Sequence, residues 1–345
     1  MNRRTLETAD SWWRMRHNHV WIDERKLRED SYLAVGRGEE FHMPAWDFEG
    51  IYPQSNEAFP RFIFWTSVVN FRYNYPVMTN GTLEKFAALD VYGKEQRGAN
   101  ALQAIFYRAF SEGPIRSGHI LHHMRSSESA KEFFRGTGKE IPMLFERRVM
   151  LLEAANIVLA YFDGDPINIF KEAKYRAHSK AGGLGIIDTL TLGFPMGFGQ
   201  DRYPAPGTGE LLSFNKRANL VAVMYEGRAR ASKGELPVIE DIAEVGPIPD
   251  YQLPRSYKAD GIFRYSDELN RTIDQGIPVT SDSAMQIETR GATVWAQLHE
   301  LKCVNEARQD KGLAPLHIGH VDAYRWFRGR KYTGQEPLIC DTTDC

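Results

Sequence analysis

One interruption between two apolar-periodic segments constrains this chain more than any other feature. Within Leu236–Tyr257 (LPVIEDIAEVGPIPDYQLPRSY), a segment with apolar residues at helical spacing stops at Gly246-Pro247, and another begins directly after Asp250. Proline lacks a backbone donor and restricts the residue before it, so one helix cannot run through this stretch. Asp is a preferred N-cap, and the positive end of a helix favours a charged carboxylate. The stretch therefore predicts a corner between helices, with Asp250 either as a cap or as a catalytic carboxylate.

Length and charge limit the class of protein. The 345 residues, 42% of them hydrophobic and 26% charged, suffice for one large or two ordinary soluble domains. Because the formal net charge is -2, no overall basic excess indicates a nucleic-acid or membrane-surface partner. The composition favours a small-molecule substrate, no stable nucleic-acid partner and no membrane partner, and it indicates no oligomeric state.

Cysteine usage and the absence of long apolar runs predict a cytoplasmic protein. The three cysteines, Cys303, Cys340 and Cys345, are odd in number and lack metal-ligand spacing, which is typical of a reducing compartment without a disulfide framework. The N-terminal MNRRTLETADSWW has no apolar run after its basic residues, so it is not a signal peptide. No window approaches the roughly 20 apolar residues that span a bilayer.

Most of the chain shows helical spacing and little strand-like alternation, so the fold is predicted to be mainly α. Helices are expected over 98–112 and 141–162, from about Pro166, over 211–230, and from a cap at Ser281 or Asp282 to about Asp310. The apolar run 62–73 is compatible with a buried strand or a buried helix, and periodicity does not decide between them.

Two patterns that resemble cofactor or metal sites are outweighed by simpler interpretations. His119, His122 and His123 recur at helical spacing, but no further ligand stands nearby, so a solvated helix face is favoured over zinc. The glycine cluster 182–185 lacks a preceding strand and does not indicate a dinucleotide site. We expect neither a metal nor a cofactor.

Several polar or aromatic residues have two interpretations each. Asn70, inside the apolar run, must find hydrogen-bond partners or bind a ligand. Phe198 lies in a loop-rich stretch that is either a surface excursion or the lip of a pocket. Glu288, Gly291 and Trp295 fall near one helix face, where the glycine makes room for a planar ligand or for a crossing helix.

Eight blocks, in this order and across nearly the whole chain, resemble the queuosine salvage protein family. They are VWID (20–23), FIFWTSVVNFRY (62–73), RGANALQAIFYRAFSEGPI (97–115), IPMLFERRVMLLEAANIVL (141–159), FNKRAN (214–219), DYQLP (250–254), IETRGATVW (287–295) and VDAYRW (321–326).

The resemblance implies an enzyme that hydrolyses queuosine 5′-monophosphate, cleaving the bond between its 7-deazaguanine-type base, queuine, and the ribose. It also implies a helical fold similar to that of helix-hairpin-helix DNA glycosylases, in which a hairpin presents a catalytic Asp. We expect one such domain over residues 1–345, with two helical lobes, about 1–210 and 211–345, around one cleft. A binding protein that does not cleave, and a glycosylase for another nucleotide or a DNA base, remain alternatives.

Matching the blocks assigns the expected site residues. Asp250 matches the catalytic Asp of Asp-Tyr-x-Leu-Pro, Asp322 the acid of the later Asp-x-Tyr-x-Trp block, and Lys216 the Lys of Phe-x-Lys-Arg-Ala. Asp250 would stabilise or attack the positive charge on the ribose, and Asp322 would bind substrate or position water. The expected substrate-binding residues are Asn70, Phe71, Phe198, Lys216, Tyr251, Glu288, Arg290, Trp295 and Trp326, with Glu288 on the base edge and aromatic rings stacking on the base.

The chain departs from the family pattern at three places. Ser67 and Met224 stand where acids are expected, and the C-terminal PLICDTTDC replaces a stretch that is usually basic. The contacts to the phosphate and to the amine side chain of the base are therefore expected to differ.

Overall fold

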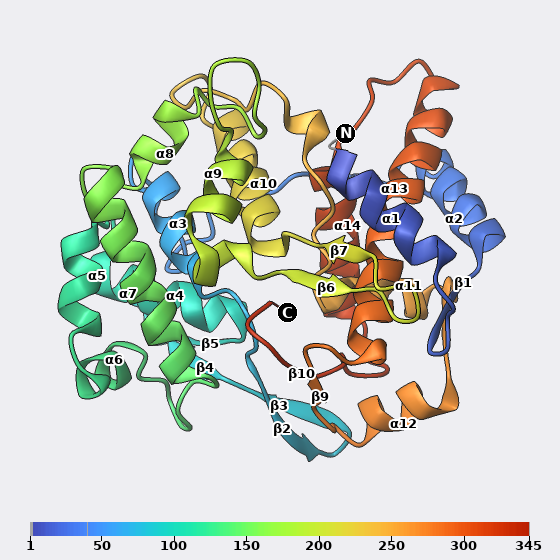
Figure 1. Cartoon of the computed structure of the whole chain (residues 1–345), viewed down its shortest axis with the longest axis horizontal. Coiled ribbons are helices and arrows are strands. Elements are labelled where there is room, and N and C mark those ends of the chain that lie inside the picture. The colour runs from blue at the N-terminus through green and yellow to red at the C-terminus, as the bar shows by residue number, and fades with distance from the viewer. Residues whose placement is uncertain (1–2, 40, 345) are drawn as a thin grey trace.

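The computed structural model describes residues 3–39 and 41–344. As expected, the fold is mainly helical, with short strands in two-stranded sheets. Figure 1 shows α3 to α7 on one side of the molecule and α1, α2 and α13 on the other.

The helices account for most of the ordered backbone. Their bounds are α1 Arg3–Arg14, α2 Glu24–Gly36, α3 Phe59–Val68, α4 Ala99–Phe110, α5 Ser117–Met124, α6 Ser127–Phe133, α7 Leu144–Tyr161, α8 Ile167–Glu172, α9 Ile186–Gly193, α10 Lys216–Ala231, α11 Gln252–Ala259, α12 Asp267–Asp274, α13 Ala284–Gln309 and α14 Ile318–Lys331. A π-helical turn η1 (Pro195–Gly199) and a 3-10 turn η2 (Ile242–Glu244) complete the set.

The strands form five pairs rather than one sheet. Antiparallel pairs join β1 (Val20–Ile22) to β8 (Phe263–Tyr265), β2 (Asn74–Thr79) to β3 (Thr82–Lys85), β4 (Ala87–Leu89) to β5 (Glu95–Arg97), and β6 (Arg202–Pro204) to β7 (Leu211–Ser213). β9 (Val279–Thr280) and β10 (Cys340–Asp341) pair in parallel. β1–β8 and β9–β10 join segments that are distant in the sequence.

One hydrophobic cluster runs through the described residues from Ala9 to Cys340. The run 62–73, which periodicity left undecided, begins inside α3, and every residue of that helix is buried. Two buried arginines hold the turn after α3: Arg147 donates to the carbonyl oxygens of Val69, Phe71 and Arg72, and Arg217 donates to that of Val68 at 2.7 Å. This turn is rigid because charged donors satisfy its buried carbonyls.

Helix α13 packs against α1 and α2. A Cβ atom on Gly291 would lie 2.1 Å from the Trp12 ring of α1, so Gly291 makes room for that helix and not for a ligand. Glu288, one turn earlier, accepts hydrogen bonds from the backbone amides of Asn18, His19 and Val20 at 2.7–3.1 Å. The N-terminal segment is thereby fastened to α13.

Several helix boundaries differ from those expected from the sequence, because local caps or strand pairs determine where the helices begin. The expected helix over 98–112 is α4, and that over 141–162 is α7, which starts later, at Leu144. The helix expected from 211 starts only at Lys216, because residues 211–213 pair with β6. Ser283, not Ser281 or Asp282, caps α13 by accepting from the amide of Gln286.

Among the described residues, no helix combines the length and apolar character that a membrane span requires. The same residues contain no cluster of three or more His, Cys, Asp or Glu side chains arranged to hold a metal ion. Cys345 lies outside the described residues, so the expected lack of a disulfide framework stays a prediction.

Two histidines at the start of α14 predict a pH-dependent stability. Burial, the nearby His320 and Arg230 lower the pKa of His317 to about 3, and burial first, then Arg230, Arg308 and His42, lower the pKa of His320 to about 4. Below the unfolded value near 6.5, the unfolded chain binds protons that the folded chain excludes. Stability is therefore expected to fall between pH 6.5 and about 4, by up to about 1.4 kcal/mol per pH unit for each histidine.

Urea unfolding at pH 7, 6 and 5 measures this loss. His317→Asn keeps an acceptor for the Gly319 amide but removes one titrating group, so its stability should decline less steeply with falling pH than that of the wild type. Equal slopes for the two proteins would contradict the assignment.

Candidate active site

The loop before Asp250 is held by two side-chain amides. Only η2 is helical in the apolar-periodic segment before the break, so the helix on that side of the corner is a single 3-10 turn. Asn219 of α10 donates to the carbonyl of Pro247 at 2.9 Å, and Gln297 of α13 donates to that of Ile248 at 3.2 Å. Gly246 is required by close approach, since a Cβ there would lie 2.6 Å from the Thr5 hydroxyl oxygen.

Asp250 acts as a cap and is also presented to a cavity. Its Oδ1 accepts from the backbone amide of Gln252, the first residue of α11, at 2.9 Å. Its Oδ2 lies 3.1 Å from the Lys216 ammonium, and its side chain is 14% exposed. The helix start and the lysine both favour negative charge on this carboxylate.

Lys216 is itself held in place by a buried network. It opens α10, its side chain is 1% exposed, and its backbone amide donates to Asp201 at 2.8 Å. Arg290 donates to both oxygens of Asp201 at 2.6 and 2.8 Å, in a two-point ion pair. Arg290 was expected to bind substrate. In the structure it instead fixes a carboxylate, because its guanidinium pairs with Asp201.

Asp250 lines a cavity of about 300 Å³. Its wall is formed by Trp46, Tyr52, Asn70, Tyr73, Thr82, Leu83, Lys85, Arg97, Gly98, Ala99, Asn100, Gln103, Leu220, Met224, Ile248, Asp250, Tyr251, Gln252, Arg255, Asp322, Ala323, Trp326 and Arg330. The volume is at the lower end of the range for small-molecule sites, and aromatic rings dominate the apolar wall. We call this space the main cavity.

Asp322 of α14 lines the same cavity as Asp250 and differs from it in environment. It is 7% exposed, and its Oδ1 is buried without a hydrogen-bond partner among the described residues. Burial first, and then the charge of Asp250, raises the pKa of Asp322 well above its usual range, although Lys216 opposes the shift. The two carboxyl groups of the site therefore differ in environment, since Asp250 is paired with Lys216 whereas Asp322 is buried with a raised pKa, and such a difference suits acid–base chemistry.

Of the other residues expected to bind substrate, three more line the main cavity. Asn70 is there, with its Oδ1 accepting from the Tyr73 hydroxyl at 3.0 Å, and so are Tyr251 and Trp326. Lys216 reaches the cavity through Asp250. Five residues taken from the blocks therefore line one cavity: Asn70, Asp250, Tyr251, Asp322 and Trp326.

Glu288 and Trp295 were expected to contact the base, but neither lines the main cavity. The Glu288 carboxylate is fully buried and occupied by the backbone amides of residues 18–20. Trp295 stacks between Trp13, with centroids 4.8 Å apart, and His299, at 3.5 Å. Their shared helix face meets α1 rather than the cavity.

Phe71 and Phe198 are also corrected, because both are core residues. Phe71 is fully buried, with the Arg147 guanidinium 4.2 Å from its ring centroid. Phe198 packs against Phe64 and Phe194 in the interior. Neither lines the main cavity.

The main cavity also contains cations that the sequence analysis missed: Lys85, Arg97, Arg255 and Arg330. Burial lowers the pKa of Lys85; Glu336 opposes this, and the three arginines lower it further. Among the described residues, neither Lys85 nor Arg330 has a carboxylate within 4 Å, whereas Arg97 pairs with Glu95 at 2.8 Å. This group of like charges favours an anionic ligand. Of these cations, only Arg330 could have been found from the sequence, because Asp322, Trp326 and Arg330 follow one another at intervals of four residues on one helix face.

The three departures from the family pattern lie in different parts of the structure. Met224 lines the main cavity, whereas Ser67 is buried in α3 and does not. The carboxylate of Asp344, in the C-terminal PLICDTTDC, pairs with Arg217 at 3.2 Å and accepts from the Tyr203 hydroxyl. None of the described residues of that segment, 337–344, lines the main cavity.

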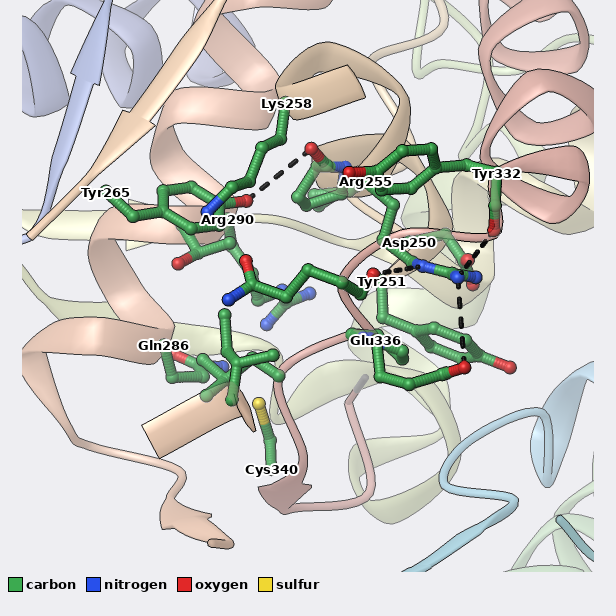
Figure 2. A pocket seen from close by; sticks show the side chains of 17 residues that line it. Asp250, Tyr251, Arg255, Lys258, Tyr265, Gln286, Arg290, Tyr332, Glu336 and Cys340 are labelled. Carbon is green, nitrogen blue, oxygen red and sulfur yellow. Dashed lines mark hydrogen bonds and ion pairs between the residues drawn. The ribbon is translucent and has the colours of Figure 1, made fainter. Parts of the chain in front are cut away.

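Two further spaces adjoin the main cavity. An adjoining outer cavity of about 470 Å³ shares Trp46, Tyr52, Asn100, Trp326 and Arg330 with it. A second space, of about 30 Å³, lies on the far side of Asp250 and Tyr251, where Figure 2 shows Arg255 between the Tyr332 carbonyl and Glu336. It is large enough for a water molecule or two and too small for a nucleotide, so the main cavity is the candidate active site.

Comparison with known proteins finds similarity over most of the chain. A family model described as queuosine salvage protein matches residues 51–345. The chain is 27% identical over 330 residues to the queuosine 5′-phosphate N-glycosylase/hydrolase of Sphaerobacter thermophilus, covering 95% of this chain and 91% of that relative. It is 25% identical over 321 residues to the protein of that name in Bos taurus, covering 91% and 89%.

Proposed function

The chain belongs to the queuosine salvage protein family, and from this membership we propose that it hydrolyses the N-glycosidic bond of queuosine 5′-monophosphate, releasing queuine for salvage. The relatives named as queuosine 5′-phosphate N-glycosylase/hydrolases support the reaction. The observation that carries the proposal on this chain is the pair Asp250 and Asp322 on a single cavity, the first paired with Lys216 and the second buried without a hydrogen-bond partner for its Oδ1 among the described residues.

Asp250 would act on the sugar. Cleavage of the bond between C1′ and the base nitrogen builds positive charge on the ribose, and a fixed carboxylate nearby lowers the energy of that state. The Lys216 ammonium and the Gln252 amide hold both Asp250 oxygens, so little reorganisation is needed during the reaction.

Asp322 would supply the proton for the departing base. The base nitrogen takes the electron pair of the broken bond, and the neutral carboxyl of Asp322 protonates the base. Water adds to C1′ and gives up one proton, which restores the starting protonation of the pair. The products are the free base and ribose 5-phosphate, so atoms and charge balance.

Lys85 and Arg330 are the proposed phosphate contacts. Both line the main cavity, and neither has an ion-pair partner within 4 Å among the described residues. A phosphate would relieve the repulsion between Lys85 and the three arginines around it. The phosphate contacts are thus proposed on β3 and α14, in place of the C-terminal basic stretch of the family pattern.

Lys85→Met is expected to raise KM for queuosine 5′-monophosphate by about 10- to 100-fold, the worth of one charged hydrogen bond. Because the nucleoside queuosine lacks the phosphate, its kcat/KM should change little. Steady-state kinetics with both compounds measures the difference. Lys131→Met, at a surface lysine paired with Glu140, is the matched control. An equal loss with both compounds would contradict a phosphate role.

The direct test is incubation with queuosine 5′-monophosphate and mass spectrometry of the products. Free queuine and ribose 5-phosphate in equal amounts are expected, with slower or no release from guanosine and deoxyguanosine monophosphates. A stable complex without free base would instead identify a binding protein, and release from duplex DNA would identify a DNA glycosylase.

We also propose that the enzyme works on the free nucleotide in the cytoplasm, without a stable nucleic-acid partner. The formal net charge of -2 supports this, because a duplex-binding protein usually carries a basic surface. The division into lobes of about 1–210 and 211–345 likewise stays a proposal.

A further inference from the structure

The wall of the main cavity contains buried polar atoms that the protein itself does not satisfy. Gln103 of α4 lines the cavity and is 2% exposed, yet its Oε1 is buried without a hydrogen-bond partner among the described residues. Asp322 Oδ1, on the same cavity, is in the same condition. A buried acceptor left unpaired costs about 1–3 kcal/mol, so an amide at this position calls for a ligand.

Gln103 is a polar residue among apolar neighbours on α4, so its unpaired amide oxygen is not explained by the packing around it. Its neighbours on α4, Leu102, Ala104, Ile105 and Phe106, are fully buried apolar residues. Asn100, three residues earlier and on the same helix face, also lines the main cavity. An apolar side chain of similar size would pack at position 103 without the penalty.

Gln103 belongs to the buried part of the cavity wall. Tyr52, Tyr73 and Met224 are buried wall residues as well, whereas the cations Arg97 and Arg330 are exposed to solvent. A nucleotide placed with its phosphate at the cations would direct its flat, apolar base toward the buried rings. Gln103 then meets the edge of the base.

We propose that Gln103 binds the lactam edge of the base, where a ring N–H stands next to a ring carbonyl. The planar amide offers one acceptor and one donor side by side: Oε1 accepts from the ring N–H, and Nε2 donates to the carbonyl. This two-point pairing selects bases with a guanine-type lactam edge, which 7-deazaguanine-type bases carry. It rests on the proposed function, of which it specifies the base contact.

If Gln103 binds the base, its replacement should change base affinity without lowering the melting temperature, whereas a purely structural role would lower both. Gln103→Met keeps the size of the side chain and removes its polar atoms. Because the unpaired amide is lost, the melting temperature is expected to rise or stay the same. Because the base contact is lost, affinity for free 7-deazaguanine is expected to fall about tenfold or more.

The experiment is calorimetric titration of wild type and Gln103→Met with 7-deazaguanine and with 2-amino-7-deazapurine, which lacks the carbonyl. The wild type should bind 7-deazaguanine more tightly, and the variant should bind both bases about equally. Gln103→Leu, which also lacks polar side-chain atoms, serves as a second variant should Met disturb folding, and it should likewise bind both bases about equally. A variant that retains the wild-type preference overturns the inference.

Failure of this inference is distinct from failure of the proposed function. Base binding is measured without turnover, so a preference that depends on Gln103 stands even if queuosine 5′-monophosphate is not cleaved. Conversely, wild-type cleavage together with an unchanged preference in Gln103→Met overturns the base contact alone.

Discussion

Replacement of Asp250 by asparagine is expected to lower kcat for base release by about 10²–10³-fold, the usual cost of removing a main electrostatic group from a reaction centre. Asparagine keeps an oxygen for the Gln252 amide, so α11 should remain capped. It cannot offset the positive charge on the ribose, and it leaves the buried Lys216 ammonium without its counter-charge. The loss should therefore appear in kcat, with KM for queuosine 5′-monophosphate changed far less.

Single-turnover release of queuine measures the effect, and circular dichroism checks the fold. Asp23→Asn is the matched control, because Asp23 caps α2 by accepting from the Lys26 amide and lies outside the main cavity. The control should retain wild-type activity. If Asp250→Asn releases base at the wild-type rate, Asp250 is a cap only.

Asp322→Asn is the second substitution with a large expected effect. Asparagine has the shape of the neutral acid but no proton to give, so kcat should fall by about 10²–10⁴-fold if Asp322 protonates the base. In the wild type, activity should decline as pH rises through the raised pKa of Asp322. The variant should lack that decline, since nothing remains there to ionise.

The same substitution should not destabilise the fold. Because the folded pKa of Asp322 lies above its unfolded value near 3.9, folding holds a proton on a group that the unfolded chain releases. The contribution of Asp322 to the stability of the wild type therefore decreases as pH rises from about 4 to the folded pKa, whereas Asp322→Asn lacks this term. Urea unfolding at pH 4 and pH 7 should show the variant gaining relative to the wild type at pH 7. A variant that is less stable at pH 7 would indicate a structural ion pair at Asp322.

The three residues proposed to carry the chemistry stand within recognisable blocks of the sequence. Asp250, Asp322 and Lys216 come from three blocks far apart in the chain, and the structure brings them to one cavity. The helical class followed from spacing alone. Local pattern was informative here because each side chain lies at the start of a helix or on a helix face that spacing defines.

Spacing could not reveal which element faces a given helix. Glu288 and Trp295 share a face of α13, as spacing indicated, but the partner of that face is α1, some 270 residues earlier in the chain. Nothing local distinguishes a face that meets a ligand from one that meets another helix. For the same reason Phe71 and Phe198 could not be separated from true cavity residues, since all are aromatic and largely buried.

The cavity cations and Gln103 were missed for a different reason. Lys85 stands on a short hairpin strand whose place in the fold depends on tertiary contacts. Gln103 carried a signal of the same kind as Asn70, a polar amide among apolar helix positions, but only its burial without a partner shows that it matters.

The fastening of the N-terminal segment to α13 has a consequence for synthesis on the ribosome. Asn18, His19 and Val20 find the Glu288 carboxylate only after some 270 further residues have been made, and β1 waits nearly as long for β8. Until then the segment remains without its final partners, and contacts of such long sequence separation form late. Asp322, on α14, emerges later still. The proposed catalytic pair, Asp250 and Asp322, is therefore complete only once residue 322 has been made, and a shorter nascent chain lacks one of its two carboxyl groups.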